Sequence, residues 1–125
     1  MVVLDSNIWI AYLDQKDERH EKAEEMYDQL DDDIIFPEYI YLEVGSFLIR
    51  RKKEASFALF AEIAEQNVDI QLLPSSPEFF YEVRKKFRHL QSHRLSFVDV
   101  SLLVLSRSYT VMTFDQTVYK LLKKE

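Results

Sequence analysis

Short apolar runs along the chain are separated by longer stretches in which apolar residues recur every three or four positions. The run at 2–4 is β-branched and does not alternate, which predicts a strand buried on both faces. Similar runs at 34–36 and 110–114 predict two further strands. Residues 68–72 alternate apolar and polar side chains, which predicts a strand with one solvated face at a sheet edge.

Helical periodicity covers most of the remaining chain. Apolar stripes predict helices over roughly residues 8–13, 18–30, 38–53, 54–66, 77–90, 99–106 and 116–124. Because strands alternate with helices, we expect an α/β fold in which right-handed crossovers join parallel strands and helices cover both faces of the sheet. A length of 125 residues predicts a single domain, residues 1–125.

Four carboxylates occupy positions that this topology brings toward one edge of the sheet. Asp5 and Asp115 follow the first and last strands, Asp99 opens a helix, and Glu43 lies early in the helix after the second strand. In an open parallel sheet, ligands bind beyond the carboxyl ends of the strands. The sequence therefore predicts that these four acids share one rim.

Asp5 and Glu43 each have a structural alternative. Asp5 could cap the first helix, although Ser6 and Asn7 could serve as the cap instead. Glu43 lies on or beside an apolar helix face, where an unpaired carboxylate costs several kcal/mol unless a cation or a donor meets it. A buried arginine partner would meet that need as well as a metal ion would.

Asp99 and Asp115 have stronger alternatives when each is taken alone. Ser96 and Asp99 have the spacing of a capping box, with Asp in place of the commoner Glu or Gln. Asp115 could be a turn residue before the last helix. The shared location of the four acids, rather than any one of them, is what indicates a site.

A set of carboxylates without histidine or cysteine suits Mg²⁺ or Mn²⁺. Two such ions ~4 Å apart can clamp the attacking water and the leaving oxygen of a phosphodiester. The three histidines are not at metal-ligand spacing. We therefore hypothesise a metal-dependent nuclease with Asp5, Glu43, Asp99 and Asp115 as its metal ligands and catalytic groups.

The net charge of −6 is unevenly distributed. Residues 14–33 hold ten acids and three bases and contribute −7, so the remainder of the chain carries +1. Residues 84–94 contain no acid and five bases: Arg84, Lys85, Lys86, Arg88 and Arg94. These side chains could hold nucleic-acid phosphates, or they could form an ordinary solvated helix face. Any basic surface for a polyanion must therefore be local.

Two further features narrow the classes of protein. The absence of cysteine excludes disulfides and thiolate chemistry. No apolar run approaches the ~20 residues of a membrane span, and residues 1–4 lack the basic region of a signal peptide. We expect a cytoplasmic protein without membrane contact. Three aromatic residues near the acids, Trp9, Phe87 and Phe97, could stack on bases, but core packing is favoured for all three.

Together these residues resemble the PIN-domain ribonucleases, especially the VapC-type toxins of prokaryotic toxin–antitoxin pairs. The resemblance covers essentially the whole chain and rests on four segments: Val-Val-Leu-Asp5-Ser6-Asn7, Tyr-Leu-Glu43-Val, Leu-Ser96-Phe-Val-Asp99 and Thr113-Phe-Asp115. It implies a three-layer α/β/α sandwich around a parallel sheet of four or five strands. The acidity of residues 14–33 is not a feature of the family.

The resemblance also implies an activity and partners. It implies an endoribonuclease that depends on Mg²⁺ or Mn²⁺ and cleaves RNA through the four acids. The residues that would support these acids by hydrogen bonds are Ser6, Asn7, Ser96 and Thr113. A homodimer is common in the family, as is inhibition by an antitoxin that inserts a basic side chain into the acidic site.

Two other functions remain open. A phospho-acceptor or phosphatase of the same fold class would use a strand-end aspartate as nucleophile, but the segment Asp5-Ser6-Asn7 lacks the second acid that those sites need. A catalytically inactive PIN-like module could instead bind nucleic acid or protein, using Phe47, Phe57 and Phe60 for a partner.

Overall fold

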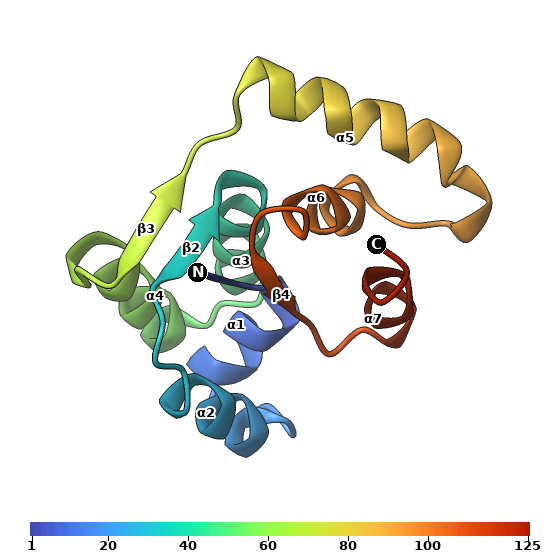
Figure 1. The fold of residues 1–125 in the computed structure, drawn as a ribbon. Helices are drawn as coiled ribbons and strands as arrows, with labels where there is room; N and C mark the ends of the chain where they lie inside the picture. The colour runs from blue at the N-terminus through green and yellow to red at the C-terminus, as the bar shows by residue number, and fades with distance from the viewer.

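The computed structural model describes residues 1–125 and is built on one sheet of four strands (Figure 1). The strands are β1 (Val2–Leu4), β2 (Ile34–Pro37), β3 (Ile70–Leu73) and β4 (Thr110–Met112). Their order is β3-β2-β1-β4, and every neighbouring pair is parallel. The predicted parallel sheet is confirmed, and the alternating segment forms an edge strand as expected.

The helices form two groups around this sheet. They are α1 (Ser6–Leu13), α2 (His20–Asp28), α3 (Glu38–Arg50), α4 (Glu54–Gln66), α5 (Pro77–His89), the short 3-10 helix η1 (Gln91–His93), α6 (Phe97–Leu105) and α7 (Gln116–Leu122). Helices α1 to α4 connect β1 to β2 to β3, whereas α5 and α6 return the chain from β3 to β4. Because such crossovers are right-handed, the return crossover covers the opposite face.

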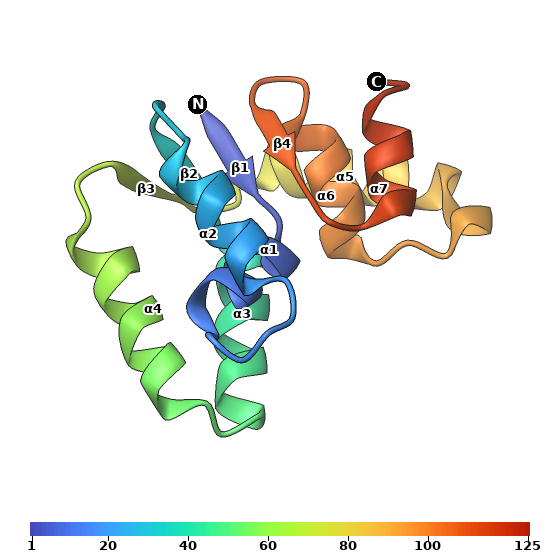
Figure 2. The same ribbon diagram turned by 90° about the horizontal axis from the view of Figure 1, so that it is seen from below.

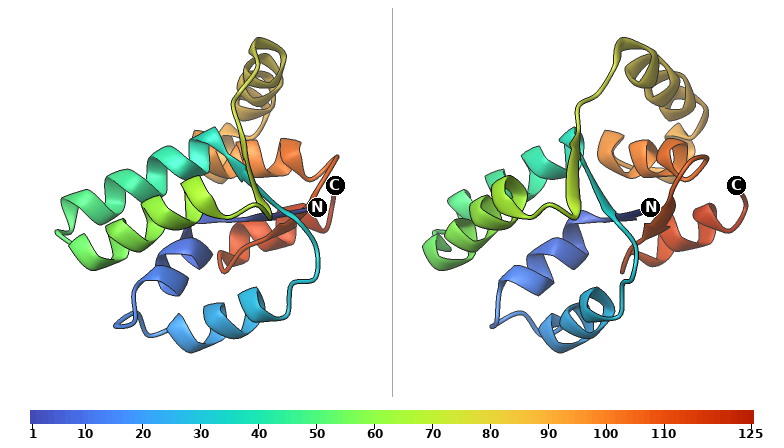
Figure 3. Two further views of the ribbon diagram at one scale, coloured as in Figure 1. Left: turned by 90° about the vertical axis from the view of Figure 1, so that its left-hand side faces the viewer. Right: turned by 60° about the vertical axis from the view of Figure 1, so that its left-hand side comes forward.

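Figures 1 and 2 show these two groups on either side of β1, the first coloured blue to green and the second yellow to red. The result is the three-layer α/β/α arrangement that the sequence predicted. Figure 3 shows α5 on the far side of the molecule from α1 and α2. No helix is long and apolar enough to cross a bilayer.

The edge strand begins two residues later than its alternating pattern suggested. Val68 is 90% exposed and precedes the strand. The side chain of Asn67 accepts a hydrogen bond from the backbone N–H of Asp69 at 2.9 Å. This local turn satisfies the N–H of Asp69, and β3 starts at Ile70.

The core centres on aromatic packing between α1 and β2. The Trp9 and Phe36 rings are stacked with their centroids 4.7 Å apart, and both side chains are buried. The prediction that Trp9 packs in the core is confirmed. Phe97 differs, because its side chain is 41% exposed and stacks on Phe87 with centroids 3.9 Å apart near the surface.

The aromatic face considered for a binding module is not a free surface. Phe60 is buried against Phe36, and Phe47 and Phe57 pack against the core. These rings hold α4 against α3 and the sheet, so their helical periodicity reflects core packing. Large apolar side chains are exposed elsewhere on α3, α5 and α6: Leu42, Ile49, Phe80, Tyr81 and Phe97.

Candidate active site

Asp5 lies at the junction between β1 and α1. Its backbone N–H donates to the carbonyl of Met112 in β4 at 2.9 Å. Its Oδ1 accepts a hydrogen bond from the backbone N–H of Ser6 at 2.7 Å, which makes Asp5 the N-cap of α1. Of the caps that the sequence allows, the structure uses Asp5 rather than Ser6 or Asn7, because α1 already begins at Ser6.

The carboxylate of Asp5 is buried and held only by uncharged donors. The side chain is 3% exposed. Its Oδ2 accepts hydrogen bonds from Thr113 Oγ1 at 2.6 Å and from Asn7 Nδ2 at 3.3 Å. No lysine, arginine or histidine forms a salt bridge with it. A buried anion without a cation is costly, and its hydrogen bonds offset that cost only in part.

The pKa of Asp5 records this environment. Burial raises the pKa of Asp5 from its ordinary 3.8 to about 6, against the opposing effect of the hydrogen bonds from Thr113 and Ser6. The charges of Asp99 and Glu43 raise this pKa further. The three carboxylates are therefore close enough for their charges to interact.

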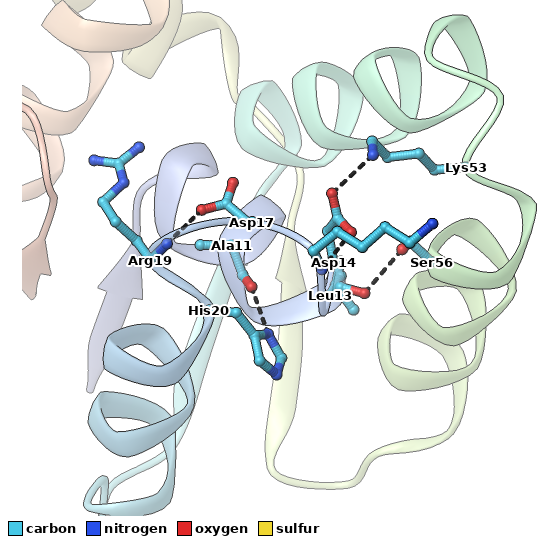
Figure 4. Close-up of polar contacts among 9 residues, drawn as sticks. Ala11, Leu13, Asp14, Asp17, Arg19, His20, Lys53 and Ser56 are labelled. Carbon is cyan, nitrogen blue, oxygen red and sulfur yellow. Dashed lines mark hydrogen bonds and ion pairs between the residues drawn. The ribbon is translucent and has the colours of Figure 1, made fainter.

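Asp14, at the other end of α1, shows the contrast. Its Oδ2 lies 2.8 Å from Nζ of Lys53, and this pairing holds the pKa of Asp14 below its usual range. Figure 4 shows Lys53 reaching Asp14, beside the 2.8 Å hydrogen bond from Ser56 Oγ to the carbonyl of Leu13. These contacts fasten α1 to α4. Asp14 is thus an acid with a structural partner, whereas Asp5 has none.

Glu43 joins Asp5 through the hydroxyl group of Ser6. Ser6 Oγ donates to Oε1 of Glu43 and also lies 3.3 Å from Oδ1 of Asp5. Glu43 is half-buried and forms no salt bridge. The alternative of a buried arginine partner is therefore not what the structure contains. One hydroxyl proton shared between two carboxylates leaves their negative charge largely uncompensated.

Asp115 is tied to the same network through Thr113. The backbone N–H of Asp115 donates to Thr113 Oγ1 at 3.0 Å, and its Oδ1 caps α7 by accepting from the N–H of Val118 at 2.9 Å. Asn7 fixes this segment, because its Oδ1 accepts from the N–H of Phe114 at 3.1 Å. Asp115 is exposed, so it stands at the rim rather than inside.

Asp99 forms the capping box that its spacing predicted. The backbone N–H of Ser96 donates to Asp99 Oδ2 at 3.1 Å, and the N–H of Asp99 donates to Ser96 Oγ at 3.0 Å. Oδ1 of Asp99 receives no hydrogen bond and remains available to a ligand. The capping role and a place near Asp5 are thus compatible, since Asp99 also raises the pKa of Asp5.

The four predicted acids come from four different helices: Asp5 caps α1, Glu43 lies in α3, Asp99 in α6, and Asp115 caps α7. No three acidic or histidine side chains converge on one point at coordination distance. Local caps and mutual repulsion both favour this separation. The donor chemistry fits a hard divalent cation, because all donors are carboxylate oxygens and none is neutralised by a salt bridge.

The basic segment lies mostly away from these acids. Arg84, Lys85 and Arg88 line an open groove of about 820 Å³ on α5, and Figure 1 shows α6 between α5 and β4. Lys86 is paired with Glu125 at 2.6 Å. Arg94, in a left-handed backbone conformation after η1, is the one base of this run in the segment that leads to Asp99.

Two bases outside that run lie beside Thr113, the residue that supports Asp5. Arg19 and Lys22 line a recess that Thr113 also lines. They belong to the acidic stretch 14–33, whose net charge concealed them. The sequence feature that could have identified them is their spacing of three residues, which places two basic side chains on one side of a helix.

Thr113→Val provides a test of the support around Asp5. The change removes the donor to Asp5 and the acceptor of the Asp115 N–H, so we expect a loss of about 1–3 kcal/mol in the free energy of unfolding. Urea denaturation measures it. Thr117→Val, on the exposed surface of α7, is the matched control and should stay within about 0.5 kcal/mol of wild type. Equal effects of the two variants would contradict the assigned contacts.

Comparison with known proteins agrees with this architecture. VapC20 of Mycobacterium tuberculosis, a toxin that cleaves the sarcin–ricin loop, has a similar crystal structure, with a TM-score of 0.85 and 17% sequence identity over 96% of this chain and 94% of that chain. No curated protein matches the sequence. The family model described as the PIN domain matches residues 2–123. Because that match spans nearly the whole chain, this protein belongs to the PIN-domain family.

Proposed function

We propose that this protein is a metal-dependent endoribonuclease and the toxin of a toxin–antitoxin pair. One observation carries the proposal: the buried carboxylate of Asp5 has no cation partner while the charges of Glu43 and Asp99 act on it. A fold that concentrates uncompensated negative charge needs a cation to complete it. Membership of the PIN-domain family and the fold shared with VapC20 support the same activity.

The four acids would hold Mg²⁺ or Mn²⁺, with Asp5 and Asp99 as central ligands and Glu43 and Asp115 as outer ones. When bound, such an ion supplies Lewis acidity and lowers the pKa of a water molecule. The contribution of the surrounding residues is to position these carboxylates. Ser6 and Thr113 fix the two oxygens of Asp5 by hydrogen bonds of 2.7 and 2.6 Å.

The remaining supports orient the other acids. The Ser6 hydroxyl holds the Glu43 carboxylate toward Asp5. Ser96 holds one oxygen of Asp99 and leaves the other free. Asp115 stands exposed at the rim, where an RNA strand would enter. Because this surface is acidic, the substrate would have to present a flexible or looped segment whose phosphate can approach the site.

Cleavage of RNA in the presence and absence of metal tests the proposal. We expect a fluorescently labelled, unstructured RNA to be cut with Mg²⁺ or Mn²⁺, to remain intact in excess EDTA, and to be cut again after the metal is restored. A labelled DNA strand of the same sequence is the control for selectivity. Cleavage that persists in EDTA, or no cleavage with either metal, would contradict the proposal.

An apolar groove beside Glu43 supports a protein partner. It has a volume of about 550 Å³ and is lined by Leu42, Phe80, Phe97 and other residues of α3, α5 and α6. We also propose that the protein is a cytoplasmic homodimer. We propose that an antitoxin covers this groove and directs a basic side chain toward Glu43. An inhibited, stoichiometric complex with the product of a neighbouring gene would support this assignment.

The alternative function, a catalytically inactive binding module with the same fold, can be distinguished from a nuclease by its affinity for metal. Calorimetric titration with Mn²⁺ should give binding that weakens when any of the four acids is replaced. A module without catalysis would bind a partner but show no such dependence.

A further inference from the structure

A second recess opens next to the four acids. It has a volume of about 510 Å³ and is lined by Arg19, Lys22, Thr113, Phe114, Gln116 and Tyr119. Thr113 is shared between the two sites, because its Oγ1 donates to Oδ2 of Asp5 at 2.6 Å. The recess therefore adjoins the candidate active site at Thr113, on the side of α2 and α7.

Two cations meet at one aromatic ring in this recess. The guanidinium carbon of Arg19 lies 4.8 Å from the centroid of the Phe114 ring, and Nζ of Lys22 lies 5.3 Å from the same centroid. The ring attracts both charges through its quadrupole. The ring thereby holds two flexible side chains in place. The backbone of Phe114 is itself fixed by its hydrogen bond to Asn7.

Neither cation has a carboxylate partner. Arg19 and Lys22 take part in no salt bridge, although ten acids lie within residues 14–33. Asp17 accepts a hydrogen bond from the backbone N–H of Arg19 at 2.8 Å. Figure 4 shows the Arg19 guanidinium directed away from the Asp17 carboxylate.

Two like charges near one ring repel each other, and a bound anion would compensate that repulsion. No carboxylate lies within salt-bridge distance of either cation, and the recess that both line is open to an anion. The candidate active site, in contrast, is negatively charged, and its acids repel the phosphates of RNA. A paired cation next to Thr113 offsets that repulsion at the point where a strand leaves the acids.

We propose that Arg19 and Lys22, held by Phe114, bind a backbone phosphate of the RNA adjacent to the one that is cleaved. This inference rests on the proposed ribonuclease function and identifies where the substrate strand leaves the site. The strand runs from the acids across Thr113 into the recess. The basic run on α5 is not part of this contact, because Arg84, Lys85 and Arg88 line a separate groove.

The test compares two double variants of identical charge change. Arg19→Gln/Lys22→Gln removes the proposed contact, and Arg51→Gln/Lys52→Gln removes the same residue types from the exposed end of α3, outside every candidate binding site. Arg19 and Lys22 are exposed, so the first variant keeps the fold. Binding of a short, unstructured, fluorescein-labelled RNA is measured by anisotropy at several salt concentrations with Mg²⁺ present, in an Asp99→Asn background that prevents cleavage.

Because the two cations neutralise one phosphate, their loss should reduce the slope of log affinity against log salt by about 0.7 and weaken binding roughly fourfold near physiological salt. The control variant should retain the wild-type slope. In the cleaving protein, Arg19→Gln/Lys22→Gln should raise KM and leave kcat nearly unchanged, because a flanking phosphate is bound alike in the ground and transition states. Phe114→Leu should weaken binding in the same direction.

The possible outcomes separate this inference from the proposed function. If the wild-type protein cleaves RNA while Arg19→Gln/Lys22→Gln keeps both the slope and KM, the inference is overturned and the function stands. An equal loss of slope in the Arg51→Gln/Lys52→Gln control also overturns it, because the effect would then be one of net charge. If RNA binding shows the expected loss but no metal-dependent cleavage occurs, the phosphate site is supported and the proposed function fails.

Discussion

Replacing Asp5 by asparagine should lower RNA cleavage at saturating Mg²⁺ by about 10³-fold or more. Asparagine has nearly the same shape and can still accept the hydrogen bond from the N–H of Ser6, but it carries no charge. Metal coordination contributes several kcal/mol of transition-state stabilisation, and each 1.36 kcal/mol corresponds to a tenfold change in rate. Asp99→Asn should produce a loss of similar size, measured as kcat in the labelled-RNA assay.

Asp14→Asn is the matched control, because it makes the same substitution at the other end of α1. It removes the 2.8 Å ion pair with Lys53 and should weaken the fold slightly without changing kcat. Cleavage that survives Asp5→Asn or Asp99→Asn unchanged would defeat the assignment of these acids. A loss of activity in Asp14→Asn equal to that in Asp5→Asn would indicate an effect of folding instead.

Without metal, the wild-type protein should become more stable as the pH falls from neutrality, and Asp5→Asn should remove this gain. The folded-state pKa of Asp5 is raised to about 6 from 3.8. The stabilisation from this group is therefore fully present below the unfolded-state pKa and is lost as pH rises through about 6. The shift corresponds to about 3 kcal/mol in total, of which roughly 1.4 kcal/mol is gained between about pH 7 and pH 5.

Urea denaturation of EDTA-treated wild type and Asp5→Asn at the two pH values measures this effect. The difference between the two proteins isolates Asp5, because the carboxyls of Asp14 and Asp32, whose pKa values are lowered by Lys53 and by the N-terminal amine, titrate in both. Added Mg²⁺ should stabilise the wild type at neutral pH but not the variant. An identical pH dependence in the two proteins would show that Asp5 is not a strained anion.

These two effects have one origin. Burial disfavours the charged form of Asp5, which raises the pKa of this carboxyl and destabilises the metal-free protein at neutral pH. The same charge would bind the cation that catalysis needs. Stability is commonly lost in this way at functional sites. A variant that is more stable and inactive is the expected outcome at Asp5.

The sequence alone determined the class of fold and the residues to suspect. Hydrophobic periodicity separates strands from helices because it depends on the local geometry of each element. Alternation over 68–72 located an edge strand, and the spacing of Ser96 and Asp99 located a capping box that the structure contains. The positions of the acids at strand ends predicted a common rim from topology alone.

Only the tertiary structure decided how side chains from distant segments meet. Ser6 contacts Glu43 across 37 residues, and Arg19 and Lys22 meet the ring of Phe114 although the sequence places them in its most acidic stretch.

It also placed the basic run of α5 away from the acids and buried Phe60 in the core. Local interactions specify where an element begins and which face is apolar. The direction in which a polar side chain points across the molecule depends on how the crossover helices pack on the twisted sheet, and no short stretch of sequence contains that information.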